Sequence, residues 1–215
     1  MHLPFNFQLI ENAWDAGVLA QLIRAHEASL SDFGWPNWAL GSHDAPRIAA
    51  RTGEAKARVA AMLLSTLRGT PTLYQGDELG IGEVPIRPER VRDPQDLRQP
   101  GLGIGRDRSR TPTPWGASPH AGLSDVDPWL PLNPDWQTQN VTAQSGDPEP
   151  MLSLYRRLLA LLRQHAALAV GRMRAVGAQD EILSYERSLN GDRLLVALNM
   201  GGERRPLVYP PGKRP

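Results

Sequence analysis

The sequence predicts an α/β fold, and three observations support this interpretation. Between residues 3 and 75, short apolar segments alternate with stretches of helical periodicity, which is typical of parallel βα units. Polar residues follow each apolar segment, as they do where the strands of α/β proteins end. After Gly171, two alternating segments flank Asn190-Gly191, which is a hairpin signal. We therefore expect a parallel sheet with its helices, followed by a smaller antiparallel sheet.

The first strand and the first helix are expected near the start of the chain. Residues 3–9 form a short strand in this interpretation, because Phe5, Phe7 and Leu9 alternate and share one face. Asp15 is expected to cap the next helix, since a carboxylate accepts hydrogen bonds from the unpaired N–H groups of a first turn. The apolar positions of that helix recur at helical spacing and are Val18, Leu19, Leu22 and Ile23.

Two further strands enclose a second helix. Residues 35–40 and 69–74 are predicted to be strands, and polar side chains follow each of them. Between them, residues 53–67 are rich in Ala, Arg, Lys and Glu, which favour helix. The stripe that this helix is expected to bury comprises Val59, Met62, Leu63 and Leu67. Glu78, after the third strand, is expected to have a structural role, since an acidic residue at a strand end commonly binds backbone amides or an arginine.

A long segment with little predicted regular structure runs from residue 81 to residue 150. Gly and Pro are frequent there, but tryptophans are also present, and a disordered segment usually contains few aromatics. We therefore expect ordered loops in which Trp115 and Trp129 belong to the core. Residues 105–112 concentrate charge, which makes this loop a functional candidate.

The last third of the chain is predicted to contain a helix and the antiparallel sheet. Residues 151–168 carry an apolar stripe at helical spacing. Residues 182–187 and 194–199 are the expected strands of the hairpin, and residues 207–209 are a candidate third strand.

Charge and composition exclude several classes of protein. Lys and Arg total 24 and Asp and Glu total 23, so the net charge of +1 gives no reason to expect a nucleic acid or a membrane as a partner. There is no cysteine, which excludes disulfides and thiolate metal sites. No metal-ligand spacing links His2 and His43 to nearby acids, so neither a metal nor another cofactor is expected. The N-terminus lacks the features of a signal peptide, and we expect a cytoplasmic protein.

The most informative segment is 41–47, Gly-Ser-His-Asp-Ala-Pro-Arg, which follows the second predicted strand. His43, Asp44 and Arg47 offer a hydrogen-bond donor, an anion and a cation at one strand end. Such a set suits sugar hydroxyls or an oxocarbenium ion, but it is not a complete catalytic set. The ordinary alternative is a structural hydrogen bond between His43 and Asp44.

Several segments, in the same order, resemble the α-glucosidase branch of the α-amylase superfamily, glycoside hydrolase family 13. Residues 2–7 are similar to its sixth barrel strand, residues 41–47 to the motif after the seventh strand, and residues 69–78 to the motif of the eighth. Residues 105–115 are similar to a loop that is typical of α-glucosidases and oligo-1,6-glucosidases. The resemblance covers nearly the whole chain.

This resemblance implies a partial TIM (β/α)8 barrel, with strands six to eight and their helices in residues 1–168. It also implies a truncated antiparallel β-sandwich domain in residues 169–215. The resemblance to the α-glucosidase branch implies hydrolysis of short α-glucosides of the maltose or isomaltose type. The family hydrolyses them with retention of configuration. The family's nucleophile Asp and acid/base Glu follow strands four and five. Both would lie before Met1, and the isolated chain is therefore expected to be inactive.

The resemblance also assigns site residues. Asp44 resembles the family's third carboxylate, which bonds the hydroxyls of the reacting sugar and favours its oxocarbenium-like state. His43 resembles the neighbour that donates to the same hydroxyls, and Arg47 and Arg110 are expected to shape the substrate site. Ser42 stands where the family usually has Asn.

Two other functions stay open at this level. The chain could be a non-catalytic sugar-binding or interaction module, although a binding surface has no need of a transition-state carboxylate such as Asp44. It could also be one half of a split enzyme whose partner is the N-terminal half of the barrel. The sequence does not distinguish α-1,4 from α-1,6 linkages, or hydrolysis from transglycosylation.

Overall fold

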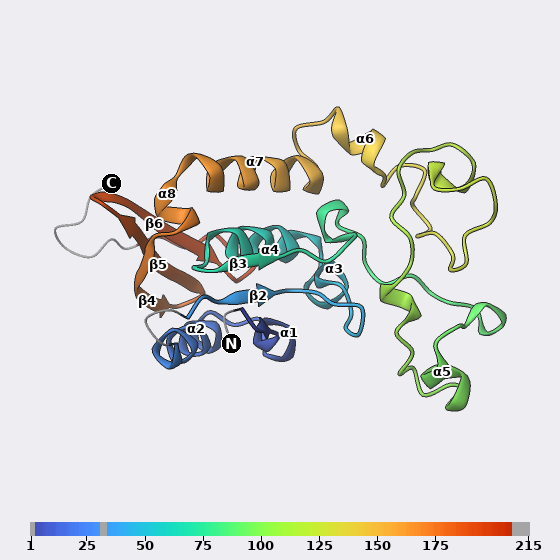
Figure 1. The fold of residues 1–215 in the computed structure, drawn as a ribbon, viewed down its shortest axis with the longest axis horizontal. Coiled ribbons are helices and arrows are strands. Elements are labelled where there is room, and N and C mark those ends of the chain that lie inside the picture. The colour runs from blue at the N-terminus through green and yellow to red at the C-terminus, as the bar shows by residue number, and fades with distance from the viewer. Residues whose placement is uncertain (1–2, 31–33, 208–215) are drawn as a thin grey trace. The chain divides into compact units, whose positions relative to one another are not determined.

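The fold is described from a computed structural model, which defines residues 3–30 and 34–207 (Figure 1). In chain order its helices and strands are β1 (Phe5–Asn6), α1 (Gln8–Glu11), α2 (Ala16–Ser29), β2 (Asn37–Ala39), α3 (Ile48–Thr52), α4 (Glu54–Thr66), β3 (Thr70–Thr72), α5 (Pro94–Arg98), α6 (Val141–Ser145), α7 (Met151–Gln164), α8 (Ala166–Ala169), β4 (Arg172–Gln179), β5 (Ile182–Leu189) and β6 (Asp192–Asn199). Between β3 and α7 the chain forms loops with single-turn helices, which agrees with the predicted lack of long elements there.

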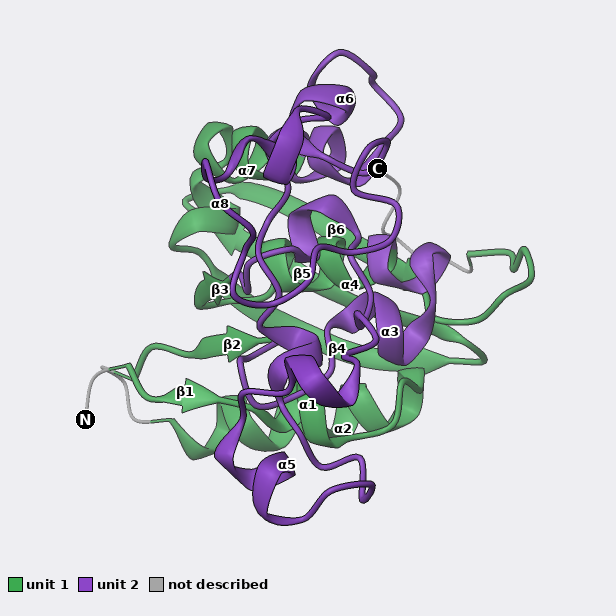
Figure 2. Cartoon of the chain, turned by 90° about the vertical axis from the view of Figure 1, so that its right-hand side faces the viewer, with its two compact units in different colours: residues 1–39, 59–72, 158–215 green, residues 40–58, 73–157 purple. Residues whose placement is uncertain are grey.

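The chain divides into two compact units (Figure 2). The first unit comprises residues 1–39, 59–72 and 158–215, and the second comprises residues 40–58 and 73–157. Both sheets belong to the first unit, whereas the segments that follow β2 and β3 belong to the second. The predicted domain boundary between residues 168 and 169 stays a prediction.

The first unit contains one parallel and one antiparallel sheet, each of three strands in the described part of the chain. In the parallel sheet β2 lies in the middle, with Phe5 opposite Asn37 on one side and Asn37 opposite Thr70 on the other. β5 is the central strand of the antiparallel sheet, and α2 packs against both β4 and β5. The predicted α/β fold with a separate antiparallel sheet is confirmed.

The first predicted strand is wrong in its extent. β1 covers only Phe5–Asn6, and the helical turn α1 begins at Gln8. The cause is local, because the Asn6 side-chain oxygen accepts a hydrogen bond from the Gln8 amide at 2.9 Å and turns the chain. Leu9 is buried on α1, while Phe5 and Phe7 are exposed and stack on each other at 5.8 Å between ring centroids.

Helix α2 follows the prediction, and helix α4 departs from it in one respect. Asp15 caps α2 as expected, since its carboxylate accepts from the Val18 amide at 2.9 Å. In α4 the predicted buried stripe is wrong at Met62, which is exposed. The buried face of α4 includes the small side chains of Ala60 and Ala61, which permit close packing.

The helix predicted for residues 151–168 is interrupted at His165, whose backbone is extended (φ −112°, ψ 103°), so that α7 and α8 are separate. The hairpin between β5 and β6 is confirmed, with left-handed φ values of 49° at Asn190 and 93° at Gly191. The third strand is β4 rather than residues 207–209. Leu207 is not in a strand, and residues 208 and 209 lie outside the described part of the chain.

A buried arginine ties β5 to the neighbouring helices of the first unit. Arg187 is fully buried, and its guanidinium donates to the carbonyl of Thr66 at 2.7 Å, to that of Leu168 at 2.7 Å and to that of Gly171 at 3.0 Å. These carbonyls lie at the end of α4, within α8 and just after α8. Burial of a guanidinium is tolerated because the carbonyls replace its water.

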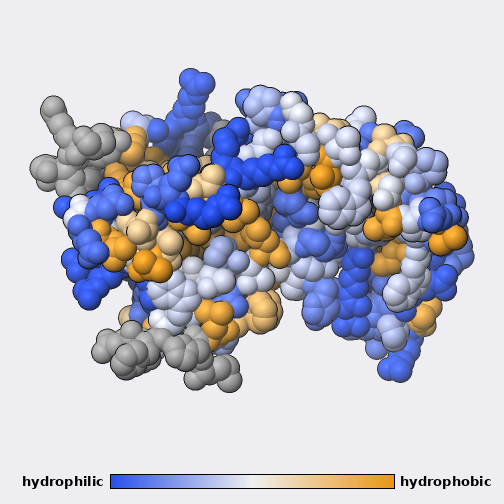
Figure 3. All heavy atoms as spheres, turned by 45° about the horizontal axis from the view of Figure 1, so that its top comes forward, coloured by the Kyte–Doolittle hydropathy of each residue, from blue (hydrophilic) through white to orange (hydrophobic). Residues whose placement is uncertain are grey.

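Hydrophobic residues also reach the surface. They interrupt the hydrophilic residues on the face drawn in Figure 3. The exposed large apolar side chains include Phe5, Leu102, Val126, Trp129 and Val170. Within residues 3–30 and 34–207, no helix combines the length and the apolar character needed to cross a membrane.

We expect Arg187→Leu to lower the free energy of unfolding by roughly 3 kcal/mol or more, because three buried carbonyls lose their donor. The matched control is Arg193→Leu in β6, which removes an exposed ion pair with Glu186 and should cost less than about 1 kcal/mol. Urea denaturation of both variants measures the difference. Equal losses would contradict the role assigned to Arg187.

Candidate functional site

The segment after β2 forms a tight turn that presents two polar side chains. The Ser42 hydroxyl accepts a hydrogen bond from the Asp44 amide at 3.2 Å, and the Ser42 carbonyl accepts from the Ala45 amide at 3.4 Å. Leu40, just before the turn, is buried, whereas the side chains of His43 and Asp44 are exposed. The turn therefore directs the polar side chains outward while the strand end stays in the core.

Two arginines and a histidine lie close to the Asp44 carboxylate. Its Oδ1 accepts from Arg110 Nη2 at 2.8 Å and from Arg106 Nη1 at 3.1 Å, and His43 Nε2 lies 3.4 Å away. Partial desolvation raises the pKa of the Asp44 carboxyl, but the Arg110 hydrogen bond and the charges of His43 and Arg106 outweigh it. The net pKa lies below the usual aspartate value, so Asp44 is a carboxylate at neutral pH.

These contacts use only one of the two oxygens of the Asp44 carboxylate. The Asp44 side chain is 52% exposed, and within residues 3–30 and 34–207 its Oδ2 accepts no hydrogen bond. Arg110 is fixed by a second contact, because its Nε donates to the His43 carbonyl at 2.9 Å. The arrangement therefore holds a charged acceptor in place and leaves it open to a further donor.

Arg106 is itself held by a buried acid. Asp93 Oδ2 accepts from Arg106 Nε at 2.8 Å, and Asp93 Oδ1 accepts from Arg106 Nη2 at 2.9 Å. The Arg106 guanidinium holds the pKa of Asp93, whose side chain is buried, well below its usual range. Sequence reasoning missed Arg106 and Asp93 as site residues. The charge cluster of residues 105–112 was the only signal, and it does not show which arginine faces Asp44.

Arg47 occupies the interior of the second unit. Its guanidinium is fully buried and donates to the carbonyls of Gln75 at 3.1 Å, Gly82 at 3.2 Å and Thr111 at 3.0 Å, and to the Thr111 hydroxyl at 3.2 Å. Gly76 permits this position, since a Cβ there would lie 2.8 Å from Arg47 Nε and its φ is +90°. In this structure Arg47 joins loops, and its direct contact with a substrate stays a prediction.

Two acidic residues follow β3 with different environments. Glu78 accepts a hydrogen bond from the Gly76 amide at 2.8 Å, which confirms its predicted structural role. Asp77 is buried, and this burial raises the pKa of its carboxyl to about 7 even though the Arg47 charge and the Ile48 amide act in the opposite direction. Gly41 makes room for it, because a Cβ at Gly41 would lie 2.8 Å from Asp77 Oδ2.

The predicted burial of the two tryptophans is wrong. Trp115 is 53% exposed and Trp129 is 71% exposed, and both lie on loops outside the helices and strands. In the described part of the chain no three His, Cys, Asp or Glu side chains gather to hold a metal ion. His2, which was considered with His43, lies outside the described residues.

The chemistry available at Asp44 is hydrogen bonding to a polyhydroxylated ligand. A carboxylate can accept from two neighbouring hydroxyls, and the arginines that contact its Oδ1 can donate to others. His43, Asp44 and Arg110, all predicted from the sequence, are brought together here. Their roles toward a substrate remain predictions.

Sequence comparison relates the chain to known proteins. Residues 4–171 match the family described as "Alpha amylase, catalytic domain". A probable alpha-glucosidase of Rhizobium meliloti is 35% identical over 79% of this chain and 32% of its own length. An oligo-1,6-glucosidase of Halalkalibacterium halodurans is 33% identical over 82% of this chain and 36% of its own length. The chain thus spans about a third of the length of these curated relatives.

A solved structure extends the similarity to the fold. The alpha-glucosyl transfer enzyme XgtA superposes with a TM-score of 0.88 and 32% sequence identity, over 97% of this chain and 40% of its own. The similarity includes both sheets and the loops that carry the candidate site. It confirms the fold class predicted from the sequence.

Asp77 should make stability depend on pH. Its carboxyl has a pKa of about 7 in the folded chain and about 3.9 when unfolded, so between these values only the folded chain holds the proton. We expect the free energy of unfolding, relative to Asp77→Asn, to be highest below pH 4 and to fall as the pH rises to about 7. Chemical denaturation across this range measures it. The exposed control Asp135→Asn should follow the wild-type curve, and a constant difference between wild type and Asp77→Asn would contradict the expectation.

Proposed function

The chain belongs to the alpha-amylase catalytic-domain family, and from this premise we propose that it forms part of an α-glucosidase-type hydrolase that acts on short α-glucosides. The structures it resembles are glycoside hydrolase family 13 barrel enzymes, and its parallel sheet corresponds to part of such a barrel. The names of its relatives, a probable alpha-glucosidase and an oligo-1,6-glucosidase, support the substrate class.

The observation that carries the proposal is the environment of Asp44. It lies just after β2, ionised and half-exposed, and Arg106 and Arg110 fix one of its oxygens. In the proposed role its carboxylate accepts hydrogen bonds from ring hydroxyls of the sugar that reacts. Such bonds strengthen as positive charge develops on the sugar ring, so they stabilise the transition state more than the ground state.

The neighbours of Asp44 have supporting roles in this proposal. His43 and Arg110 donate to hydroxyls of the same sugar, and both have side chains that are partly exposed next to the carboxylate. Arg106 and Asp93 act as positioning residues, because Arg106 contacts Asp44 while Asp93 holds Arg106. Arg47 positions the surrounding loops through its buried hydrogen bonds.

Retaining hydrolysis needs two further carboxylates, a nucleophile and an acid/base, about 5–5.5 Å apart. In the family these groups follow barrel strands four and five, whereas the segments of this chain resemble strands six to eight. We infer that the N-terminal part of a barrel supplies them, in the same polypeptide or as a separate partner.

The first test is sugar binding. We expect the 215-residue chain to bind methyl α-glucoside in calorimetric titration, and we expect Asp44→Asn to weaken this binding at least tenfold, or by roughly 1.4 kcal/mol. The control Asp135→Asn removes an exposed carboxylate of the second unit and should bind as wild type does. Binding that is unaffected by Asp44→Asn would contradict the role of this carboxylate.

The second test is turnover of a nitrophenyl α-glucoside. The purified 215-residue chain should release no nitrophenol above the uncatalysed rate, because the nucleophile and the acid/base are supplied elsewhere in this proposal. Addition of a polypeptide with the first five strands of the barrel should restore hydrolysis. Turnover by the 215-residue chain alone, lost in Asp44→Asn, would show that it holds a full catalytic set.

A further inference from the structure

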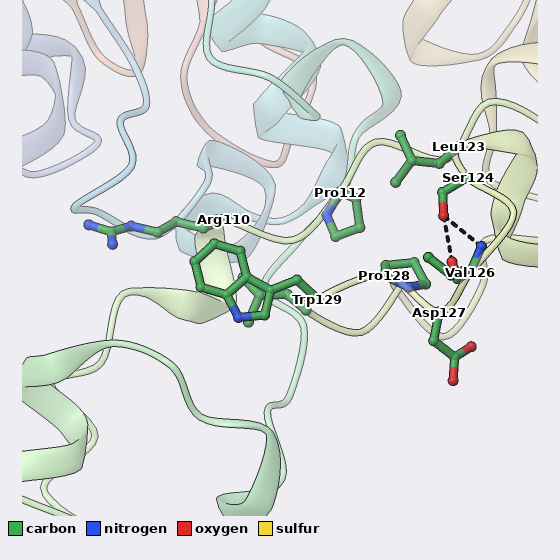
Figure 4. Close-up of a pocket in the computed structure, with 9 residues that line it drawn as sticks. Arg110, Pro112, Leu123, Ser124, Val126, Asp127, Pro128 and Trp129 are labelled. Atoms are coloured by element: carbon green, nitrogen blue, oxygen red, sulfur yellow. Dashed lines mark hydrogen bonds between the residues drawn. The ribbon is translucent and has the colours of Figure 1, made fainter.

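The position of Asp44 depends on the segment that carries it, residues 41–48, which we call the turn segment. In Figure 4 the Arg110 guanidinium points away from the pocket that Arg110 lines, and its Nη2 donates to Asp44 at 2.8 Å. Arg110 belongs to the charged loop of residues 105–112, so one segment places the cation and another places the anion. A displacement of the turn segment would therefore separate Asp44 from Arg110.

The carboxyl of Asp77 contacts both ends of the turn segment within the second unit. A Cβ added to Gly41 would lie 2.8 Å from Asp77 Oδ2, so this oxygen lies directly against the Gly41 backbone. At the other end, the amide of Ile48, the first residue of α3, donates a hydrogen bond to the Asp77 carboxyl. Asp77 is only 3% exposed. One buried side chain thus bridges the backbone on either side of Asp44.

The ionisable groups that face Asp77 favour different charge states. Two arginines favour the carboxylate, whereas burial, which is the largest effect, and a neighbouring glutamate favour the neutral acid. The balance raises the pKa of the Asp77 carboxyl to about 7. Among the described residues these groups are Arg47 before α3, Arg51 within α3, Glu78 next to Asp77, and Tyr155 on α7.

The hydrogen bonds around Asp77 fit the neutral acid better than the carboxylate. Asp77 Oδ1 is buried and has no hydrogen-bond partner within the described residues. A buried carboxylate that lacks a donor costs free energy until it finds one. The neighbouring cation Arg51 already donates to the Pro46 carbonyl at 3.2 Å and to the Leu40 carbonyl. A carboxylate that attracts Arg51 therefore weakens the contacts that hold the turn segment near both of its ends.

We propose that Asp77 is a positioning residue for Asp44, and that its protonated form holds the turn segment in the geometry that binds a sugar. The proposal rests on the proposed function, because the sugar is the one bound by Asp44. Loss of the proton leaves a buried anion, which draws Arg51 away from the turn segment and moves Asp44 relative to Arg110. Sugar affinity therefore falls as the pH rises through the pKa of Asp77.

The first test is calorimetric titration of the 215-residue chain with methyl α-glucoside between about pH 6 and pH 8. When only the protonated form binds, a pKa of about 7 makes the affinity fall about tenfold over this range. Asp77→Asn has nearly the same size and stays neutral, so at pH 8 it should bind as wild type does at pH 6. Asp77→Ala loses the contacts with the turn segment and should bind weakly at both values. The control Asp135→Asn, at an exposed position, should keep the wild-type fall.

The second test follows the turn segment without a sugar. The amides of Asp44 and Ala45 donate the two hydrogen bonds of the turn, so their NMR shifts report its geometry. In a pH titration, wild type should show an additional step with a midpoint of about pH 7 that Asp77→Asn lacks. His43 is the same in both proteins, so the difference between the two curves belongs to Asp77.

The outcomes separate this inference from the proposed function. The same pH dependence of binding in wild type and Asp77→Asn would overturn the inference, and the proposed function would stand if Asp44→Asn still weakened binding. Weak binding by Asp77→Asn at both pH values would also overturn the inference, because the carboxylate would then be the form that holds the turn segment. No binding by wild type at any pH would overturn the proposed function, and the amide titration would then decide whether Asp77 positions Asp44.

Discussion

The candidate site depends on the hydrogen bonds of one buried guanidinium, that of Arg47. Three loop segments place carbonyl oxygens around it, at Gln75, Gly82 and Thr111. Without this donor the carbonyls of Gln75 and Gly82 would lose their hydrogen-bond partner, while Thr111 would retain only the hydrogen bond from Gln75 Nε2 at 3.2 Å. Without the carbonyls, Arg47 would be a buried charge with few partners. The loops and the arginine therefore require each other. Thr111 adjoins Arg110, and Arg47 lies three residues after Asp44, so the same contacts set the distance between the anion and its cation.

The charges of neighbouring side chains then determine the protonation state of Asp44. Asp93, Arg106, Asp44 and Arg110 form a row of alternating charges, in which Asp93 is buried and the exposed carboxylate of Asp44 lies between the two arginines. At the buried end, both carboxylate oxygens of Asp93 accept hydrogen bonds from Arg106. Asp44 keeps an unused carboxylate oxygen within the described residues, and this oxygen is what a sugar would engage. Arg110 also lines a pocket together with the exposed ring of Trp129.

The sequence predicted those features whose cause is local. Asp15 and Asn190-Gly191 act within a few residues of themselves, and both the helix cap and the hairpin were found where expected. Features that depend on distant partners were missed. β4 is irregular between Arg174 and Gly177, so its alternation is weak, and only pairing with β5 makes it a strand. The choice of Arg106 as a partner of Asp44, and the exposure of Trp129, follow from how the loops pack, which no periodicity encodes.

The central claim is that the arginines hold Asp44 as an ionised, oriented carboxylate. The most direct measurement is the pKa of the Asp44 carboxyl, followed by carbon-13 NMR across a pH titration of wild type and of Arg110→Gln. We predict a value below that of an ordinary aspartate in the wild type and a higher value in the variant, because Arg110 supplies the shortest of its hydrogen bonds. An ordinary pKa in the wild type that does not respond to Arg110→Gln would contradict the claim.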